Sequence, residues 1–156
     1  MQPWQLDRIN SCVRGENPTV MAKMKSGYAV FGDIQFLPGY CVLLGYPKVF
    51  SLNELSLAER SQYILDTTLI GDAIIKVCNP LRINYATLMN TDPYLHTHIH
   101  ARYDWEPEEF RKGPTWWWSK EKLLRPEHDW QQFEELKQDI TSALTEIMNQ
   151  AYPYTK

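Results

Sequence analysis

Residues 95–103 read LHTHIHARY and place a histidine at every second position, at His96, His98 and His100. The whole chain has only four histidines, so three of them are gathered in this one segment. Successive side chains of a β-strand point to opposite faces, and residues at i, i+2 and i+4 therefore share one face. The residues between the histidines are mostly apolar and suit a core. The stretch predicts a strand with a histidine face and a core face.

A row of three histidines indicates chemistry, because the ordinary pKa of this side chain lies near neutrality. Histidine can act as a base, an acid, a nucleophile or a metal ligand. Two histidines at i and i+2 on a strand can also chelate zinc if a third ligand comes from elsewhere, although the sequence places no partner carboxylate or cysteine pair. A chance alternation of polar residues on an exposed strand is the third interpretation.

The rest of the chain predicts an α+β fold, an antiparallel sheet with helices packed on it. Two apolar, β-rich runs are joined by QFLPGY, in which Pro38-Gly39 has the chemistry of a type II turn. Ser56 and Glu59 have capping-box spacing and begin a segment of helical periodicity. We expect helices at residues 4–13, 56–78 and 130–148, and strands at 27–33, 40–46, 82–90 and 95–101.

Composition limits the class of protein. A chain of 156 residues with 44% hydrophobic and 22% charged residues fits one folded domain. The net charge of −3 provides no global basic field for nucleic acid or an anionic membrane. Cys12, Cys41 and Cys78 are odd in number and widely spaced, so we expect reduced thiols. With no run long enough to span a bilayer and no signal-peptide pattern, we expect a cytoplasmic protein.

The segment HTHIHA closely resembles the signature of the histidine triad (HIT) family, His-φ-His-φ-His-φ-φ with φ apolar. The flanking segments VFGDIQFLPGYCVLL and RINYATLMNTDPYLHTHIHARY also resemble the family's strands, and the likeness covers residues 28–103, about half the chain. It implies one HIT-like domain over residues 1–156, with a five-stranded antiparallel sheet and a long helix. Residues 104–156 would form a C-terminal loop and helix extension.

The resemblance implies a nucleotide hydrolase or nucleotidyl transferase. His98 corresponds to the nucleophile, which would attack an α-phosphorus and form a nucleotidyl-histidine intermediate that water or another acceptor releases. The backbone carbonyl of His96 would hold the other ring nitrogen of His98, and His100 would contact phosphate oxygens. Dinucleoside polyphosphates and nucleoside phosphoramidates are the implied substrates.

The resemblance also assigns the residues that bind the nucleotide. Asp33 matches the acid that accepts hydrogen bonds from the ribose hydroxyls, and Asn90 would bind a phosphate or bridging oxygen. Arg102, the cation beside the triplet, would contact a phosphate or form an ion pair at the rim, and we place it on the core side of its strand. The expected walls of the base pocket are Ile34, Phe31 and Leu43.

The implied partners are small molecules and a second copy of the chain. We expect a purine nucleotide or dinucleotide as substrate, neither nucleic acid nor membrane as a partner, and a homodimer. No tightly bound cofactor and no protein-held metal are implied, and magnesium would arrive only with the nucleotide. Of the three adjacent indoles Trp116 to Trp118, we expect two to pack under the long loop or at a subunit contact. The alternative is that one stacks on a base as a lid.

The chain departs from the HIT pattern at several positions. Tyr40 stands where the family often has a histidine in its PGH-type turn, and LLGYPKVF lacks the histidine that often follows the second strand. Pro93 occupies the position of a serine on the leaving-group side. These departures favour an alternative, a nucleotide-binding module with negligible turnover. A histidine-ligated metal hydrolase is the third hypothesis.

Overall fold

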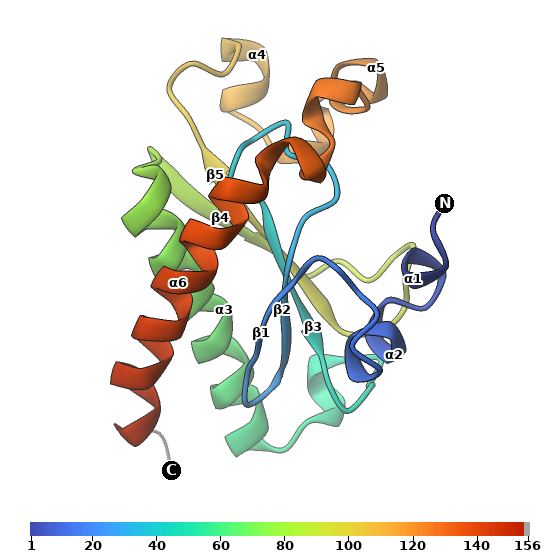
Figure 1. Ribbon diagram of the computed structural model, residues 1–156, viewed down its shortest axis with the longest axis vertical. Helices are drawn as coiled ribbons and strands as arrows, with labels where there is room; N and C mark the ends of the chain where they lie inside the picture. Colours follow the sequence, from blue (N-terminus) through green and yellow to red (C-terminus); the bar gives the residue numbers. More distant parts are fainter. Residues whose placement is uncertain (155–156) are drawn as a thin grey trace.

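The computed structural model describes residues 1–154 and contains an antiparallel five-stranded sheet in the order β1-β2-β3-β5-β4 (Figure 1). The α+β fold and the five strands predicted from the sequence are therefore confirmed. The histidine segment forms the fourth strand of this order, between β3 and β4. The strands are β1 Val20–Lys23, β2 Gly27–Phe31, β3 Cys41–Gly45, β4 Arg82–Ala86 and β5 His96–Arg102.

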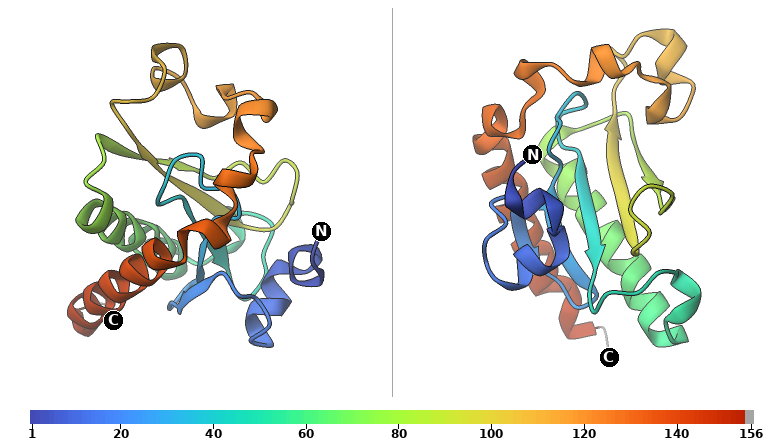
Figure 2. Two further views of the ribbon diagram at one scale, coloured as in Figure 1. Left: turned by 45° about the horizontal axis from the view of Figure 1, so that its top comes forward. Right: turned by 90° about the vertical axis from the view of Figure 1, so that its right-hand side faces the viewer.

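Two long helices, α3 (Leu57–Cys78) and α6 (Glu134–Ala151), pack against each other and cover one face of the sheet (Figures 1 and 2). The predicted capping box at the start of α3 is present, because the Ser56 hydroxyl accepts from the Glu59 amide and the Glu59 carboxylate accepts from the Ser56 amide. The helix ends at Asn79 in the left-handed conformation, φ 46°. Between these helices and the sheet lies the larger hydrophobic core.

The opposite face carries the short N-terminal helices α1 (Pro3–Leu6) and α2 (Arg8–Val13), seen at the right of Figure 1. The sequence predicts one helix over residues 4–13, but Asp7 has φ −140° and ψ 63° and interrupts it. Ile9 and Cys12 of α2 pack onto Val30, Val42 and other residues of β2 and β3 in a second, smaller apolar cluster. This cluster covers only part of the face and leaves the histidine row beside it.

The chain between β5 and α6 crosses one end of the sheet, at the top of Figure 1. It contains the short helices α4 (Glu108–Arg111) and α5 (Lys120–Leu123). The last long helix begins later than predicted, since residues Trp130–Phe133 form a 3₁₀ turn before α6. The other 3₁₀ turns are Leu52–Glu54, Thr115–Trp117, Pro126–His128 and Tyr152–Tyr154.

The turn that leads into β3 has the predicted geometry. Gly39 has φ +96°, and the Tyr40 amide donates to the Leu37 carbonyl at 3.2 Å, as a type II turn requires. The fully buried Gln35 also binds this turn, because its Oε1 accepts from the amides of Gly39 and Tyr40. The turn therefore fixes the position of Tyr40 at the edge of β3.

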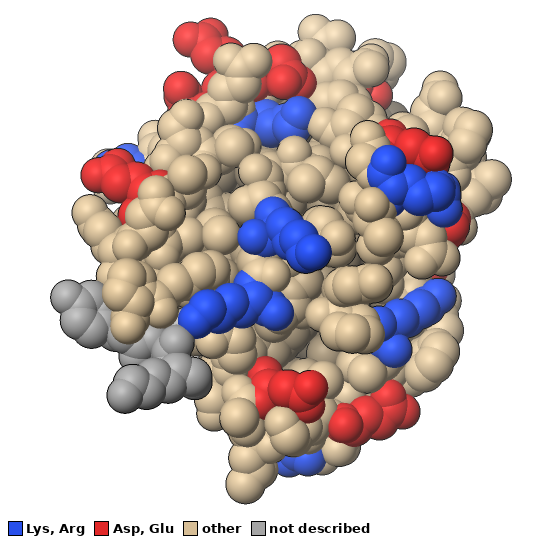
Figure 3. Space-filling model, turned by 60° about the horizontal axis from the view of Figure 1, so that its bottom comes forward, with Lys and Arg blue, Asp and Glu red and all other residues tan. Residues whose placement is uncertain are grey.

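Charged side chains are dispersed over the face seen in Figure 3, where Lys and Arg stand as separate groups among uncharged residues. Acidic side chains lie near the borders of the same face. Such a mixed distribution forms no continuous cationic surface on this side of the molecule. Within residues 1–154, none of the helices has both the length and the apolar character needed to cross a membrane.

Candidate active site

The three histidines of β5 share one face of the strand, as the alternation predicts. The ring centroids of His96 and His98 are 4.9 Å apart, and those of His98 and His100 are 6.1 Å apart. The odd-numbered residues of the strand face the helices, where Ile99 and Ala101 belong to the larger core. One strand therefore contributes both to the core and to a row of imidazoles.

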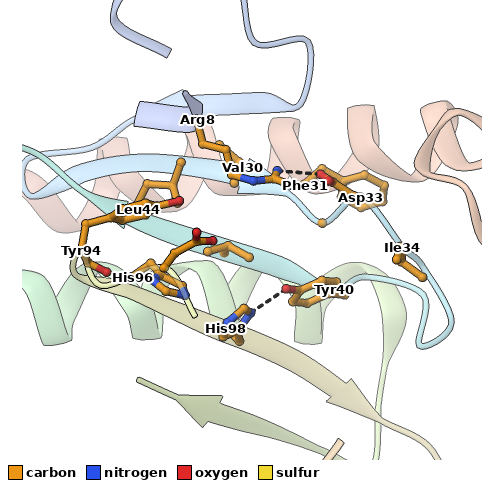
Figure 4. Close-up of a pocket in the computed structure, with 13 residues that line it drawn as sticks. Arg8, Val30, Phe31, Asp33, Ile34, Tyr40, Leu44, Tyr94, His96 and His98 are labelled. Atoms are coloured by element: carbon orange, nitrogen blue, oxygen red, sulfur yellow. Dashed lines mark hydrogen bonds and ion pairs between the residues drawn. The ribbon is translucent and has the colours of Figure 1, made fainter. Parts of the chain in front are cut away.

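His98 is hydrogen-bonded through Nδ1 to the hydroxyl of Tyr40, and the two atoms are 2.6 Å apart (Figure 4). This differs from the prediction that a carbonyl at His96 holds that nitrogen. The His96 ring has its own partner, since its Nδ1–H donates to the Tyr94 carbonyl at 2.8 Å. Nε2 is consequently the nitrogen of His98 that is left for chemistry.

Burial keeps two of the imidazoles uncharged. Desolvation, and next the proximity of His96, lowers the pKa of His98 to about 4. The pKa of His100 falls to about 3, chiefly through burial and then through the charges of His98 and Arg102. A nitrogen can attack an electrophile only with a free lone pair, so a neutral His98 at pH 7 meets the first requirement of a nucleophile.

Sheet register explains why Tyr40 reaches this site. Cys41 pairs with Ile99, so Tyr40, one residue earlier, comes opposite His100 on the same face. The two rings stack with centroids 4.1 Å apart and an interplanar angle of 2°. A Cβ at Gly32 would collide with the Tyr40 ring, so glycine permits the close approach. In the sequence, Tyr40 is recognisable only as a departure from the HIT pattern, with no sign that it belongs to the site.

Arg8 supplies a cation at the rim of the histidine row. Its guanidinium binds both carboxylate oxygens of Asp33, at 3.0 and 2.6 Å (Figure 4). Gln5 Nε2 donates to the same carboxylate at 2.9 Å. The side chains of Arg8 and Asp33 are 29% and 20% exposed. Arg8 was missed from the sequence because it lies far from the triplet in the chain, in a helix without a recognisable motif.

A cavity of about 240 Å³ opens in front of His98, between β5 and the N-terminal helices. Arg8, Asp33 and Asp92 give it charge of both signs, and aliphatic side chains of β2 and β3 give it an apolar wall. It combines a neutral imidazole, a cation and apolar surface, which are features of a small-molecule site. Its lining residues are Arg8, Val30, Phe31, Gly32, Asp33, Ile34, Tyr40, Val42, Leu44, Asp92, Tyr94, His96 and His98.

A second cavity, of about 270 Å³, lies on the other side of His98. It is almost entirely apolar and is closed in part by Trp116 and Leu123 of the C-terminal extension. Ile34, Tyr40 and His98 line both cavities. His98 therefore stands where a polar space and an apolar space meet. The remaining residues of the second cavity are Phe36, Ala86, Leu88, His100 and Thr115.

Solved structures with a similar fold are histidine triad proteins. One from Sinorhizobium meliloti matches with a TM-score of 0.66 at 18% identity, covering 94% of this chain and 95% of its own. A hypothetical histidine triad nucleotide-binding protein from Sulfolobus tokodaii matches with a TM-score of 0.67 at 12% identity, covering 96% and 99%. The fold is HIT-like. No protein-family model matches the chain, and no curated protein does.

A Plasmodium falciparum diadenosine triphosphate hydrolase shares this HIT-like fold less closely. Its TM-score is 0.53 at 16% identity, and the match covers 86% of this chain and 78% of the hydrolase. These matches confirm the HIT-like fold predicted from HTHIHA and its flanks. The His98–Tyr40 hydrogen bond and the Arg8–Asp33 ion pair are observations on this chain alone.

Several residues predicted for the nucleotide site lie elsewhere on the HIT-like fold. Leu43 points toward the helices and is part of the larger core, so Val42 and Leu44 line the cavity in its place. Phe31 borders the cavity, but it also belongs to that core. Asn90 is exposed and lines neither cavity. The predicted strand over residues 82–90 stops at Ala86, which leaves Asn90 beyond the sheet.

Arg102 lies on the histidine side of β5, not on the predicted core side, since even-numbered residues of the strand share one face. It is buried and bound to Glu106 at 3.0 Å. Its NH1 also donates to the Asn84 side chain and the Gly113 carbonyl, and its NH2 to the Phe110 carbonyl. A guanidinium so fully bonded ties the loop after β5 to the sheet and is not directed into either cavity.

The three adjacent tryptophans have different environments. Trp118 packs between Phe36 and Phe110, and its indole N–H donates to Glu106 at 3.2 Å. Trp116 and Trp117 are 58% and 55% exposed, and of these two only Trp116 lines the second cavity. Only one of the three indoles, Trp118, is packed on both sides, whereas two were expected to be packed.

The metal-hydrolase hypothesis requires further ligands beside the triplet. Within the part of the chain that the structure describes, no group of three or more His, Cys, Asp or Glu side chains is placed to hold a metal ion. His96 and His98 direct their Nδ1 atoms to Tyr94 and Tyr40. A ring nitrogen left as Nε2 is here can act as a nucleophile or as a metal ligand, so these two hydrogen bonds do not separate the two hypotheses.

Proposed function

We propose that the protein is a HIT-family nucleotide hydrolase or nucleotidyl transferase that acts at an α-phosphate through His98. The observation that carries this proposal is a neutral His98 whose Nδ1 is bonded to Tyr40, in the wall shared by two cavities. The names of two proteins with the same fold, one nucleotide-binding and one a diadenosine triphosphate hydrolase, give further support.

In this proposal the nucleoside monophosphate part of the substrate occupies the first cavity. Val42 and Leu44 offer an apolar surface to the base, and the guanidinium of Arg8 offers charge-assisted hydrogen bonds to the phosphate. Asp33 is the acceptor for the ribose hydroxyls, which must compete with Arg8 and Gln5 for its oxygens. Asn90 and Arg102 have no part in the proposed contacts because neither lines the first or the second cavity.

The reaction would proceed in two displacements. The Nε2 lone pair of His98 forms a bond to the α-phosphorus while the bond from phosphorus to the leaving atom breaks, and the leaving group departs with that electron pair. Water or another acceptor then attacks the phosphorus, the N–P bond breaks, and its electron pair returns to Nε2. The attacking water loses its proton to solvent. Dividing one difficult step into two easier steps is the benefit of covalent catalysis.

The second cavity would receive the leaving group. Its lining is apolar, and Trp116 offers an aromatic surface at its rim. A substrate with an apolar or aromatic group beyond the phosphorus, such as a second nucleoside or an amidate substituent, fits this lining. Magnesium would accompany the nucleotide where the leaving group is a polyphosphate.

We also propose that the protein forms a homodimer along the edge of β4. This strand is at the end of the sheet and, within residues 1–154, pairs with β5 alone, and an edge strand of this kind can pair with another chain. Nearby Leu81 and Tyr85 are 51% and 46% exposed, so an apolar surface accompanies the edge. Sedimentation at micromolar concentration tests this proposal, and a monomeric mass would contradict it.

Mass spectrometry tests the proposed nucleophile directly. The protein is exposed briefly to an adenylate with a slow leaving group, quenched and digested. We expect an added adenylyl group on the peptide that contains His98, and none in the variant His98→Asn, whose AMP affinity should be nearly unchanged. Tight AMP binding without adduct or product would instead support the nucleotide-binding module. Turnover that survives in His98→Asn would remove His98 from the reaction.

A further inference from the structure

The hydroxyl of Tyr40 has no counterpart in the expected site, yet within residues 1–154 it forms the only hydrogen bond to the ring of the proposed nucleophile. Its Oη lies 2.6 Å from His98 Nδ1, a short distance for this type of bond. Tyr40 also lines both cavities, so its hydroxyl lies at the same junction as the imidazole. Both groups can donate or accept, and the direction of the bond between them has a chemical consequence.

The direction of this bond decides which ring nitrogen of His98 carries the proton. If Tyr40 donates, Nδ1 accepts, and the proton of the neutral ring lies on Nε2, which then has no lone pair for attack. If Nδ1–H donates, Nε2 is unprotonated and nucleophilic, and the tyrosine hydrogen is free to point elsewhere. A neutral imidazole has only these two tautomers.

We propose that Tyr40 is the positioning residue that selects the nucleophilic tautomer of His98, and that an anionic phosphate oxygen in the cavity sets the direction of their hydrogen bond. This inference rests on the proposed function. A phosphate oxygen only accepts, so it takes the O–H of Tyr40, and the hydroxyl oxygen then accepts from Nδ1–H. Binding of the anion therefore also places the proton on Nδ1 and leaves the Nε2 lone pair available for attack. An empty site can keep the unreactive tautomer.

The proton arrangement stays balanced through the reaction. During attack, Nε2 bonds to phosphorus, the leaving group takes the electrons of its former bond, and the ring becomes cationic with its proton retained on Nδ1. The Tyr40 oxygen accepts from that N–H and stabilises the positive charge, while its own hydrogen remains bonded to the phosphate oxygen. When water releases the nucleotide, the N–P electron pair returns to Nε2 and the ring is neutral again.

The surroundings hold Tyr40 in one position. The ring lies between the stacked His100 and the backbone of Gly32, and Gln35 binds the Tyr40 amide and carbonyl. Burial, and next the negative charge of Asp33, raises the pKa of the Tyr40 hydroxyl, which keeps it protonated and able to donate at neutral pH. A fixed, protonated hydroxyl is suited to relay a hydrogen bond between phosphate and imidazole.

The variant Tyr40→Phe tests this inference because it keeps the ring and its stacking. Loss of the hydrogen-bond partners that orient metal-bound imidazoles reduces activity roughly 10- to 100-fold, and we expect a loss of similar size for this oriented nucleophile. We expect that loss in the rate of adduct formation and in kcat, with adenosine affinity unchanged, because adenosine lacks the phosphate to which the Tyr40 hydroxyl would donate. The matched control is Tyr63→Phe, which removes a buried hydroxyl bonded to Thr97 on the opposite face and should leave the rate unchanged.

Nitrogen-15 NMR of labelled histidine shows which ring nitrogen of His98 carries the proton. A purely structural role of Tyr40 would leave this tautomer unchanged. In the wild-type protein with AMP bound, we expect His98 to carry its proton on Nδ1, and in Tyr40→Phe we expect that preference to be lost. Wild-type adduct formation with an equal rate in Tyr40→Phe would overturn the inference and leave the proposed function intact. A proton on Nε2 in the AMP complex would overturn it as well. Absence of any adduct and any AMP binding in the wild type would contradict both.

Discussion

The two faces of the sheet use the same strands for opposite purposes. On the helix side, Ile99 and Ala101 of β5 are fully buried against α3 and contribute only packing. On the other side, His98 and His100 contact rings and cavities instead of a continuous core. The side chains packed on the helix side fix the position of β5, and this strand in turn fixes the imidazoles on its other face.

Polar groups on the two faces also differ in what they are bonded to. The helix-side Thr97 hydroxyl is bonded to Tyr63 and Thr87, both of which are protein groups that stay in place. On the site face, His98 is bonded at one nitrogen and leaves the other to a ligand. A closed network stabilises the fold, whereas an incomplete one is available for chemistry.

The largest effect on stability should come from shortening a side chain on the helix side. Ile99→Ala removes a fully buried side chain, and such truncations cost about 2–5 kcal/mol of unfolding free energy because of lost transfer energy and the residual cavity. Urea denaturation measures the change. The matched control Ile64→Ala, at a half-exposed position on α3, should cost less than about 0.5 kcal/mol. Equal costs at the two positions would contradict the assigned core.

Acid should destabilise the protein through the site face. His98 and His100 have pKa values of about 4 and about 3, both below the ordinary 6.5. Above pH 6.5 both rings are neutral in the folded and unfolded chain, and stability is complete. As the pH falls below 6.5 the unfolded chain binds protons that the native state excludes, so the free energy of unfolding falls until the native pKa is passed. Between pH 7 and pH 5 we expect a loss of about 2 kcal/mol for each ring.

Urea denaturation at pH 7 and pH 5 checks this loss, and His98→Asn supplies the comparison. Removing one of the two shifted rings should remove about half of the difference between the two pH values. The wild-type protein and His98→Asn carry the same carboxylates, so a contribution from these groups cancels in the comparison. A slope that is unchanged in His98→Asn would show that the ring is accessible to protons in the native state.

The fold was predictable from the sequence because its signals are local. The alternating histidines, the Pro38-Gly39 turn and the capping box at Ser56 each depend on neighbouring residues, and the structure confirms all three elements. The β1 strand was not located, since its four residues, VMAK, carry little alternation. The strand expected over residues 82–90 ends early, at Ala86. The ends of strands and helices depend on tertiary contacts, which the local sequence does not contain.

The site was predictable only where one strand supplies it. His96, His98 and His100 come together through β5 alone, but Arg8 and Tyr40 arrive through sheet register and the N-terminal helices. Arg102 shows the converse, because a cation beside the triplet in sequence is bound by Glu106 from the following loop. The position of a long side chain in the sequence therefore does not predict which group it will bind in the folded chain.

The cation of the first cavity should contribute to binding of the phosphate more than of the nucleoside. Arg8→Gln removes a partly buried guanidinium, and we expect AMP affinity to fall about tenfold, or about 1.4 kcal/mol, with adenosine affinity unchanged. Calorimetry with both ligands measures the two affinities. Arg14→Gln changes the net charge equally at an exposed position and is the control. Tighter adenosine binding with unchanged AMP binding would show that Arg8 blocks Asp33 and does not bind phosphate.

The smallest effect should come from the rim of the second cavity. Trp116 and Trp117 are adjacent and almost equally exposed, but only Trp116 lines this cavity. If the cavity receives the leaving group, Trp116→Ala should lower kcat/KM about three- to fivefold for an adenylate with an aromatic leaving group, which is the loss of roughly 40 Å² of apolar contact. It should have no effect when the leaving group is fluoride, which makes no apolar contact, and Trp117→Ala should affect neither substrate. An equal loss with both substrates would mean that Trp116 supports the site structurally, and the apolar space behind His98 would then have no part in recognising the substrate.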